Sequence, residues 1–161
     1  FQFFMLGSPA IYYGDEIGMT GGNDPDCRKA MIWDTEKQNK ELLSWYKWLI
    51  RVRKEHNCIK LGDYRTVLCD EEKNLFGFVR IYEGEEIYLV LHRGDDMVNI
   101  ELPVLHKGEY LSLTDGEKFT ANSITGTQKL YNGDILEYGG IIKSSLGAYS
   151  MKVIKKIKGG I

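Results

Sequence analysis

The sequence has little cysteine, and its three cysteines form no recognisable motif. Cys27, Cys58 and Cys69 are odd in number and include no CxxC pair, which argues against a disulfide framework and against a zinc site. Reduced thiols of this kind are typical of a cytoplasmic protein, and we expect that location. The chain begins at Phe1 rather than Met, so the sequence does not show whether a secretion signal precedes it.

The sequence also lacks a surplus of charge, a long apolar run and a complete set of metal ligands. Its 21 Lys and Arg nearly balance 23 Asp and Glu, so neither nucleic acid nor an anionic membrane is an expected partner. No run of about eighteen apolar residues is present that would span a bilayer. Calcium takes about six to eight oxygen ligands, and the short acidic clusters at residues 24–26 and 95–96 do not supply them. We therefore expect no metal and no cofactor.

What is present divides near residues 57–62 into two parts of different character. Residues 1–6 are almost wholly apolar and stop at Gly7-Ser8-Pro9, which is typical of a helix end. Residues 10–13 form a short apolar run without alternation, which indicates a strand buried on both faces, as in parallel barrels. The glycine-rich residues 14–25 then predict a long loop, and loops of this length often carry function.

A helix is predicted over residues 36–56. Thr35 is the expected N-cap, and Gln38 three residues later would complete a capping box. Apolar residues recur along this segment at helical spacing, and we interpret the stripe as part of the core. Its members are Leu42, Trp45, Tyr46, Leu49 and Val52.

From Gly62 onward, short β-prone runs alternate with turn signals such as Asn132-Gly133-Asp134, a pattern that predicts an antiparallel sandwich. Apolar and polar residues alternate on both sides of the turn at Gly84, which predicts a hairpin with one buried face. The apolar residues of that hairpin are Val79, Ile81, Ile87, Leu89 and Leu91. The predicted strands cover residues 63–68, 75–82, 87–92, 98–102, 110–114 and 149–154.

Two groups of polar residues in the N-terminal loop are candidates for function. Asp15 and Glu16 are adjacent and point to opposite faces of an extended chain, so they cannot act together on one bond. One of them can line a site, or it can hold the loop through backbone N–H groups. Asp24 and Arg28 place an acceptor and a five-donor fork four residues apart in a proline-containing turn. Such a pair can bind neighbouring hydroxyl groups of a ligand, or it can staple the loop without a ligand.

The aromatic and histidine residues are interpreted more conservatively. Tyr12, Tyr13 and Trp33 are each able to stack on a sugar ring, but buried packing is the default expectation. A second set is interpreted as structural or surface residues, because none of its members has a catalytic context. These are His56, His92 and His106.

The motifs of the N-terminal part carry a family resemblance. Residues 11–19, 21–28 and 31–34 resemble the eighth-strand loop of neopullulanases, cyclomaltodextrinases and maltogenic amylases, which are glycoside hydrolases of the alpha-amylase family. The helical residues 47–56 resemble the family's last barrel helix, and the β-rich remainder is similar in pattern to its C-terminal domain. The resemblance implies a mainly β fold. Residues 1–58 would be the remnant of a catalytic (β/α)8 barrel, and residues 59–161 would form an antiparallel β-sandwich domain.

The resemblance also implies roles. Asp24 and Arg28 would bind glucosyl units of an α-glucan on the non-reducing side of the cleavage point. No segment matches the family's aspartate nucleophile, its glutamate general acid or its transition-state aspartate. No catalytic residue is therefore predicted, and the chain alone should be inactive. Its expected partners are an α-glucan oligosaccharide in the intact enzyme, the missing barrel portion of that enzyme, and a second copy through the exposed strand at residues 10–13.

Two alternatives remain open from the sequence. The chain can be a stand-alone carbohydrate-binding or structural β-domain, with its helix and first strand as leftovers. It can also come from a relative that kept the barrel and lost the catalytic acids. The preferred α-glucan, and the balance between hydrolysis and transglycosylation, are not encoded in any motif recognised here.

Overall fold

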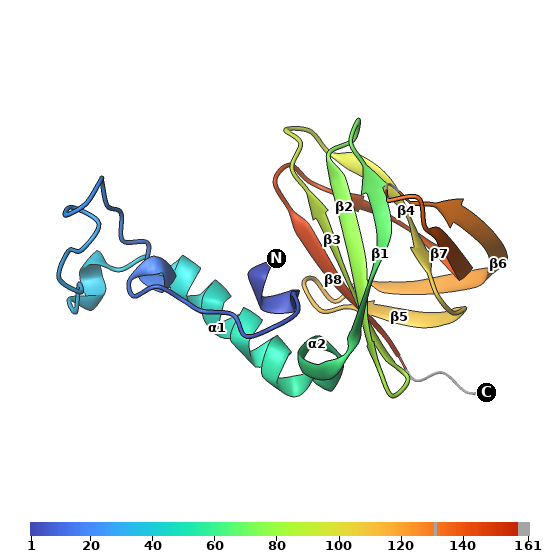
Figure 1. Cartoon of the computed structure of the whole chain (residues 1–161), viewed down its shortest axis with the longest axis horizontal. Helices are drawn as coiled ribbons and strands as arrows, with labels where there is room; N and C mark the ends of the chain where they lie inside the picture. Colours follow the sequence, from blue (N-terminus) through green and yellow to red (C-terminus); the bar gives the residue numbers. More distant parts are fainter. Residues whose placement is uncertain (131, 158–161) are drawn as a thin grey trace.

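The structure is a computed structural model that describes residues 1–130 and 132–157, so position 131 and the last four positions of the predicted second domain lie outside it. Within these residues, three short 3-10 helices and two α-helices precede a region of strands (Figure 1). The helices are η1 (Gln2–Phe4), η2 (Asp15–Ile17), η3 (Thr35–Lys37), α1 (Lys40–Glu55) and α2 (Asn57–Leu61). The strands are β1 (Asp63–Asp70), β2 (Leu75–Tyr82), β3 (Glu85–His92), β4 (Val98–Val104), β5 (Gly108–Ser112), β6 (Lys118–Lys129), β7 (Ile135–Leu146) and β8 (Met151–Lys156).

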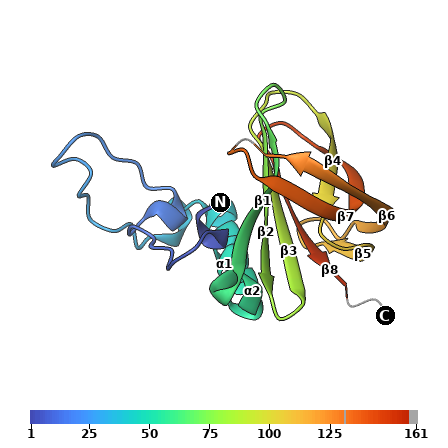
Figure 2. The same ribbon diagram turned by 45° about the vertical axis from the view of Figure 1, so that its right-hand side comes forward.

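The strands form one antiparallel sheet that folds over on itself as a sandwich, as the sequence predicted. Their order is β1-β2-β3-β8-β5-β6-β7-β4. Strand β6 connects the two layers, because its first residues pair with β5 and its later residues pair with β7. Figure 2 shows β1, β2, β3 and β8 on one side, with β4 and β7 opposite them. The main core lies between these layers, and its fully buried members include Val79, Tyr88, Val90, Leu102 and Val104.

A second core lies on the outer face of β2, β3 and β8, where the helices cover the sheet (Figure 1). Its sheet side is formed by Phe78, Ile87, Leu89 and Val153, all at most 1% exposed. Its other side is formed by Phe3, Phe4, Leu49, Val52, Cys58 and Ile59. Burying side chains of this size contributes about 1.5–3 kcal/mol each. The helices are therefore held to the sandwich by a continuous apolar contact.

The hairpin around Gly84 exists, but the prediction that it has a single buried face is wrong. In the observed register Val79 lies opposite Tyr88, so Val79 faces the inner core. Ile87 and Leu89 face the outer core instead. The two groups of apolar residues are on opposite faces, and both faces are covered because helices pack on the outside of the sheet.

The segment at residues 10–13 is not a strand, contrary to the sequence prediction. It forms no ladder with any strand of the described residues, and Ile11, Tyr12 and Tyr13 are exposed. A strand buried on both faces needs a hydrogen-bonded neighbour on each side. The sandwich supplies neither, because residues 10–13 leave the body of the molecule before η2 (Figure 1).

The α1 helix begins later than predicted. Thr35 belongs to η3, whose N-cap is Asp34, and the backbone N–H of Glu36 donates to the Asp34 carboxylate at 3.1 Å. The N-cap of α1 is Asn39, whose side-chain oxygen accepts from the Leu42 N–H at 2.9 Å. Gln38 makes no capping box, since its amide donates to the Ile32 carbonyl. The predicted stripe is core only toward the end of the helix. Leu49 and Val52 are buried there, whereas Trp45 is 40% exposed.

Two arginines join the N-terminal residues to the helices and the sheet. Arg80 of β2 is 1% exposed and donates to the carbonyls of Phe4 at 2.8 Å, Gly62 at 2.6 Å and Asp63 at 3.3 Å. Arg53 of α1 donates to the carbonyl of Phe3 at 2.7 Å and to three further carbonyls nearby. Burial and the nearby charge of Arg53 lower the pKa of Arg80. The junction is thus fixed by guanidinium–carbonyl bonds rather than by ion pairs.

Candidate functional site

The Asp24–Arg28 pair lies in the loop between η2 and η3, which projects away from the sandwich beyond the N-terminal end of α1 (Figure 1). The two side chains meet through two contacts. Arg28 Nε lies 2.9 Å from Asp24 Oδ1, and Arg28 Nη2 donates to Asp24 Oδ2 at 3.1 Å. Their side chains are 69% and 61% exposed. The guanidinium is therefore oriented by the carboxylate, while both groups remain open to a ligand.

Asp15 and Glu16 do not form a catalytic pair in this structure. The backbone N–H of Gly14 donates to Glu16 Oε2 at 2.9 Å, which matches the alternative in which one carboxylate holds the loop. Ile17 follows in the same turn and is buried, and its carbonyl accepts from the Asn39 N–H at 3.0 Å. Glu16 thus holds the turn at residues 14–16, and Ile17 anchors the base of the loop to the N-cap of α1.

The aromatic residues around the loop are exposed, so the expectation of buried packing is wrong for all three. Tyr12 is 56% exposed, Tyr13 43% and Trp33 81%. Tyr13 donates its hydroxyl to the Lys29 carbonyl at 2.9 Å, which ties the two sides of the loop together. Exposed rings in the same N-terminal segment as a carboxylate–guanidinium pair offer both apolar and hydrogen-bonding surfaces, the combination that a sugar ring requires.

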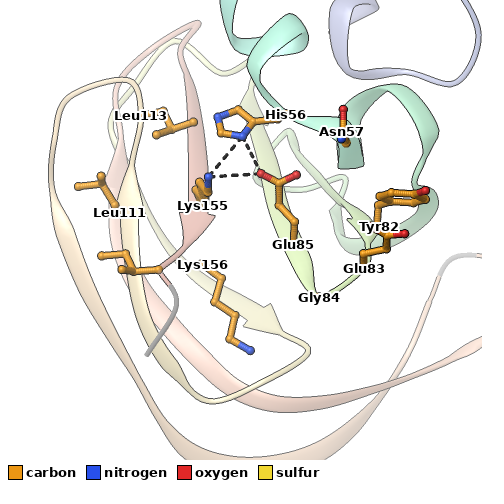
Figure 3. Close-up of a pocket in the computed structure, with 11 residues that line it drawn as sticks. His56, Asn57, Tyr82, Glu83, Gly84, Glu85, Leu111, Leu113, Lys155 and Lys156 are labelled. Carbon is orange, nitrogen blue, oxygen red and sulfur yellow. Dashed lines mark hydrogen bonds and ion pairs between the residues drawn. The ribbon is translucent and has the colours of Figure 1, made fainter. Parts of the chain in front are cut away.

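A second cluster of polar side chains was not predicted from the sequence. His56 Nδ1 lies 2.6 Å from Glu85 Oε1, and Lys155 Nζ lies 3.3 Å from both atoms (Figure 3). The other Glu85 oxygen accepts from the Cys58 N–H at 3.2 Å. Burial acts to raise the pKa of Glu85, but these hydrogen bonds outweigh burial and lower it. The cluster borders a cleft of about 630 Å³ between α2, the β2–β3 turn and the end of β8.

The remaining histidines also hold structure together. His92 is buried, and its Nδ1 lies 2.7 Å from the Gly147 carbonyl. His106 is exposed, but its Nδ1 lies 2.6 Å from the buried Glu86 carboxylate. Tyr88 donates to the other Glu86 oxygen at 2.7 Å. Burial and the Glu86 charge raise the pKa of Tyr88, so its hydroxyl remains a donor. All three histidines are therefore structural or surface residues, as interpreted from the sequence.

Neither cluster has the composition of a hydrolytic centre. Hydrolysis of a glycosidic bond uses two carboxyl groups that face one another across about 5–10 Å. In the loop, Asp24 is paired with Arg28, whereas Glu85 in the cleft contacts His56 and Lys155. Among residues 1–130 and 132–157, no group of three or more His, Cys, Asp and Glu side chains is placed to hold a metal ion. None of the helices in this part is long and apolar enough to cross a membrane.

Comparisons with known proteins identify the relatives of this chain. No protein-family model matches it. The chain is 44% identical over 126 residues to a cyclomaltodextrinase of Geobacillus thermopakistaniensis, covering 78% of this chain and 21% of that protein. It is 38% identical over 143 residues to neopullulanase 2 of Thermoactinomyces vulgaris, covering 86% and 24%. It is also 37% identical over 107 residues to the intracellular maltogenic amylase of Bacillus subtilis, covering 66% and 18%.

Solved structures give the same answer for the fold. A cyclomaltodextrinase structure superposes with a TM-score of 0.78 at 27% identity, covering 96% of this chain and 24% of that one. The β-sandwich with its preceding helix and loop thus matches the C-terminal part of alpha-amylase family glycoside hydrolases. Within that family, the chain is related to the cyclomaltodextrinase, neopullulanase and maltogenic amylase group. It spans between 18% and 24% of the length of these curated relatives.

Proposed function

We propose that this chain is the C-terminal portion of an enzyme that hydrolyses α-glucosidic bonds in maltodextrins, cyclodextrins or pullulan. The observation that carries the proposal is the 44% identity to a cyclomaltodextrinase over 78% of the chain. The catalytic carboxylates would lie in the barrel portion outside this chain. The two-carboxylate mechanism with a covalent glycosyl intermediate would then retain the anomeric configuration. The chain alone should release no reducing sugar from these substrates.

In the intact enzyme, Asp24 and Arg28 would orient a glucosyl unit rather than break its bond. The support is their geometry. The guanidinium is held at two points by the carboxylate, and both side chains are more than 60% exposed. Neighbouring sugar hydroxyls are donors and acceptors, so one of them can donate to Asp24 while another accepts from Arg28. Fixing the sugar in this way lowers the entropic cost of reaching the transition state.

The test is substitution in the longer polypeptide that contains this chain. Arg28→Ala removes charge-assisted hydrogen bonds worth about 1.5–3 kcal/mol, so kcat/KM on maltodextrins should fall roughly 10- to 150-fold. Arg28→Lys should rescue little, because an ammonium cannot make the bidentate contact. Arg65→Ala, which removes an exposed arginine of β1, is the matched control. Kinetics unchanged by Arg28→Ala would remove the binding role.

The missing barrel would also explain the exposed N-terminal segment. Residues 10–13 would become a strand when neighbouring barrel strands pair with them, and Ile11, Tyr12 and Tyr13 would then be covered. Without that partner, the same apolar side chains favour association with a second copy. Analytical ultracentrifugation of the chain should show self-association that Tyr12→Ser weakens. A monomer at all concentrations would argue against this.

The second candidate is a stand-alone carbohydrate-binding or structural β-domain. One observation favours it, since the core between the two layers is formed entirely by β1–β8 of this chain. The two candidates differ in what lies upstream. A longer polypeptide with the three carboxylates and measurable hydrolysis supports the enzyme. A polypeptide without them supports the binding or structural domain. The exposed free thiol of Cys27 and an intracellular relative support a cytoplasmic location, which cell fractionation would test.

A further inference from the structure

An apolar groove of about 670 Å³ lies between α1 and the sandwich, and neither Asp24 nor Arg28 lines it. Trp45 of α1 lines one side, and Tyr149, which precedes β8, lines another. Leu91 and Met151 contribute apolar surface, and Arg93 follows β3 at the same groove. Trp45 is 40% exposed and Tyr149 70%, so two large rings face solvent at one place.

Both rings are held in position before any ligand arrives. The Trp45 indole stacks on Trp48, with the ring centroids 4.8 Å apart and the planes 5° from parallel. Tyr149 has a φ of 45°, a left-handed conformation that is rare for a bulky residue. Its N–H donates to the Gly94 carbonyl at 3.1 Å, and its hydroxyl donates to the Asp95 carboxylate. Strain of this kind persists only where surrounding contacts enforce it, and it is concentrated at ligand sites.

The groove also carries an unused donor group. The Arg93 side chain is exposed, and within the described parts of the chain its guanidinium has no hydrogen bond or ion pair. Asp95, two residues further along the chain, already accepts a hydrogen bond from the Tyr149 hydroxyl. The groove therefore offers flat apolar rings together with a fork of five N–H donors.

We propose that this groove binds an α-glucan chain, at a place separate from the Asp24–Arg28 loop. A pyranose ring has apolar C–H faces that stack on indole and phenol rings, and its hydroxyls accept from a guanidinium. A protein helix would instead need several aliphatic pockets, whereas the exposed groups here are aromatic rings and one arginine. The choice of glucan over other glycans rests on the proposed function.

The experiment titrates the 161-residue chain with maltoheptaose and with β-cyclodextrin, followed by calorimetry and tryptophan fluorescence. Tyr149→Ala and Trp45→Ala should each weaken binding by about tenfold, the effect of losing one stacked ring. Arg93→Gln should weaken it as well. Ile135→Ala is the matched control, because Ile135 is also 70% exposed and lies on β7 outside the groove. Trp45→Phe keeps a ring and should restore part of the affinity.

Several results would overturn the proposal. These are no binding to the chain, binding that Tyr149→Ala and Arg93→Gln leave unchanged, or binding lost only on Arg28→Ala. Circular dichroism checks that each variant is folded, and Tyr149→Ala alone decides the matter if Trp45→Ala unfolds the chain. If the longer polypeptide binds the glucan equally well with and without Tyr149→Ala, other residues cover the groove there. This result would also overturn the proposal. The proposed function fails separately, by absence of hydrolysis in the longer polypeptide.

Discussion

Replacing Arg80 by methionine tests whether buried guanidinium–carbonyl bonds hold the N-terminal residues to the sandwich. The side chain is 1% exposed and donates to three carbonyls, two of them at 2.8 Å or less. Methionine is flexible and unbranched and replaces the aliphatic part of the arginine side chain, so the change mainly removes the donors. The carbonyls of Phe4 and Gly62 would be left without their Arg80 donor.

The size of the effect follows from two opposing contributions. Two hydrogen bonds from a charged donor contribute about 1.5–3 kcal/mol each, or roughly 3–6 kcal/mol together. Part of this loss is offset, because a variant without the buried guanidinium no longer carries the cost of desolvating that charge. We expect Arg80→Met to lower the free energy of unfolding by about 3 kcal/mol. Arg65→Met, on the exposed side of β1, is the control and should change it by less than about 0.5 kcal/mol.

Urea unfolding followed by circular dichroism measures the change, and limited chymotrypsin digestion shows where it acts. The variant should be cut faster near Phe3 and Phe4, because Phe4 loses its bond to β2. A variant as stable as the parent, with unchanged cleavage, would mean that the hydration cost of the buried charge cancels its bonds. The Arg80 contacts would then contribute specificity of packing and no net stability.

Three further predictions follow from single side chains. Glu85 has a lowered pKa in the folded protein, so its contribution is present above its ordinary value of 4.5 and is lost as pH falls through the folded pKa. The difference in unfolding free energy between the parent and Glu85→Gln should therefore narrow below about pH 5, and a constant difference would contradict the lowered pKa of Glu85. Burial and the Glu85 charge raise the pKa of Cys58 to about 12. Iodoacetamide at pH 8 should therefore label the exposed Cys27 and leave Cys58 unlabelled until the chain unfolds, which mass spectrometry measures. Asn39→Ala should lower the free energy of unfolding in urea by about 1 kcal/mol, because α1 loses its N-cap hydrogen bond. An unchanged free energy of unfolding would mean that tertiary packing alone determines where α1 begins.

The sequence predicted the strands whose side chains are mostly aromatic or β-branched. The strand predicted at residues 75–82 has the bounds observed for β2. It missed β6 and β7, because their Asn, Ser, Thr and Gly residues resemble a loop. Gly140 shows the physical reason. A Cβ at this position would lie 3.0 Å from both the Ala121 Cβ and the Asn122 carbonyl oxygen, so the close pairing of β6 and β7 favours glycine there. Of this pair of strands, only the connecting turn at residues 132–134 was predicted from the sequence.

The candidate loop shows the same division between local and non-local information. The Asp24–Arg28 pair spans four residues, and its geometry follows from a turn that the sequence reveals. The His56–Glu85–Lys155 cluster joins residues 29 and 99 positions apart, so no local pattern could indicate it. The exposed rings of Tyr12 and Trp33 were missed for a related reason, since burial depends on partners that a sequence motif does not specify.

The position of β8 has a consequence for how the protein is made. This strand lies between β3 and β5, yet it leaves the ribosome after the other seven. Until residues 151–156 emerge, β3 and β5 each keep an open edge, and open edges of nascent chains recruit other chains. Translation that stops before residue 151 should therefore yield a product that cells degrade or aggregate, even though most of the sandwich has already been synthesised.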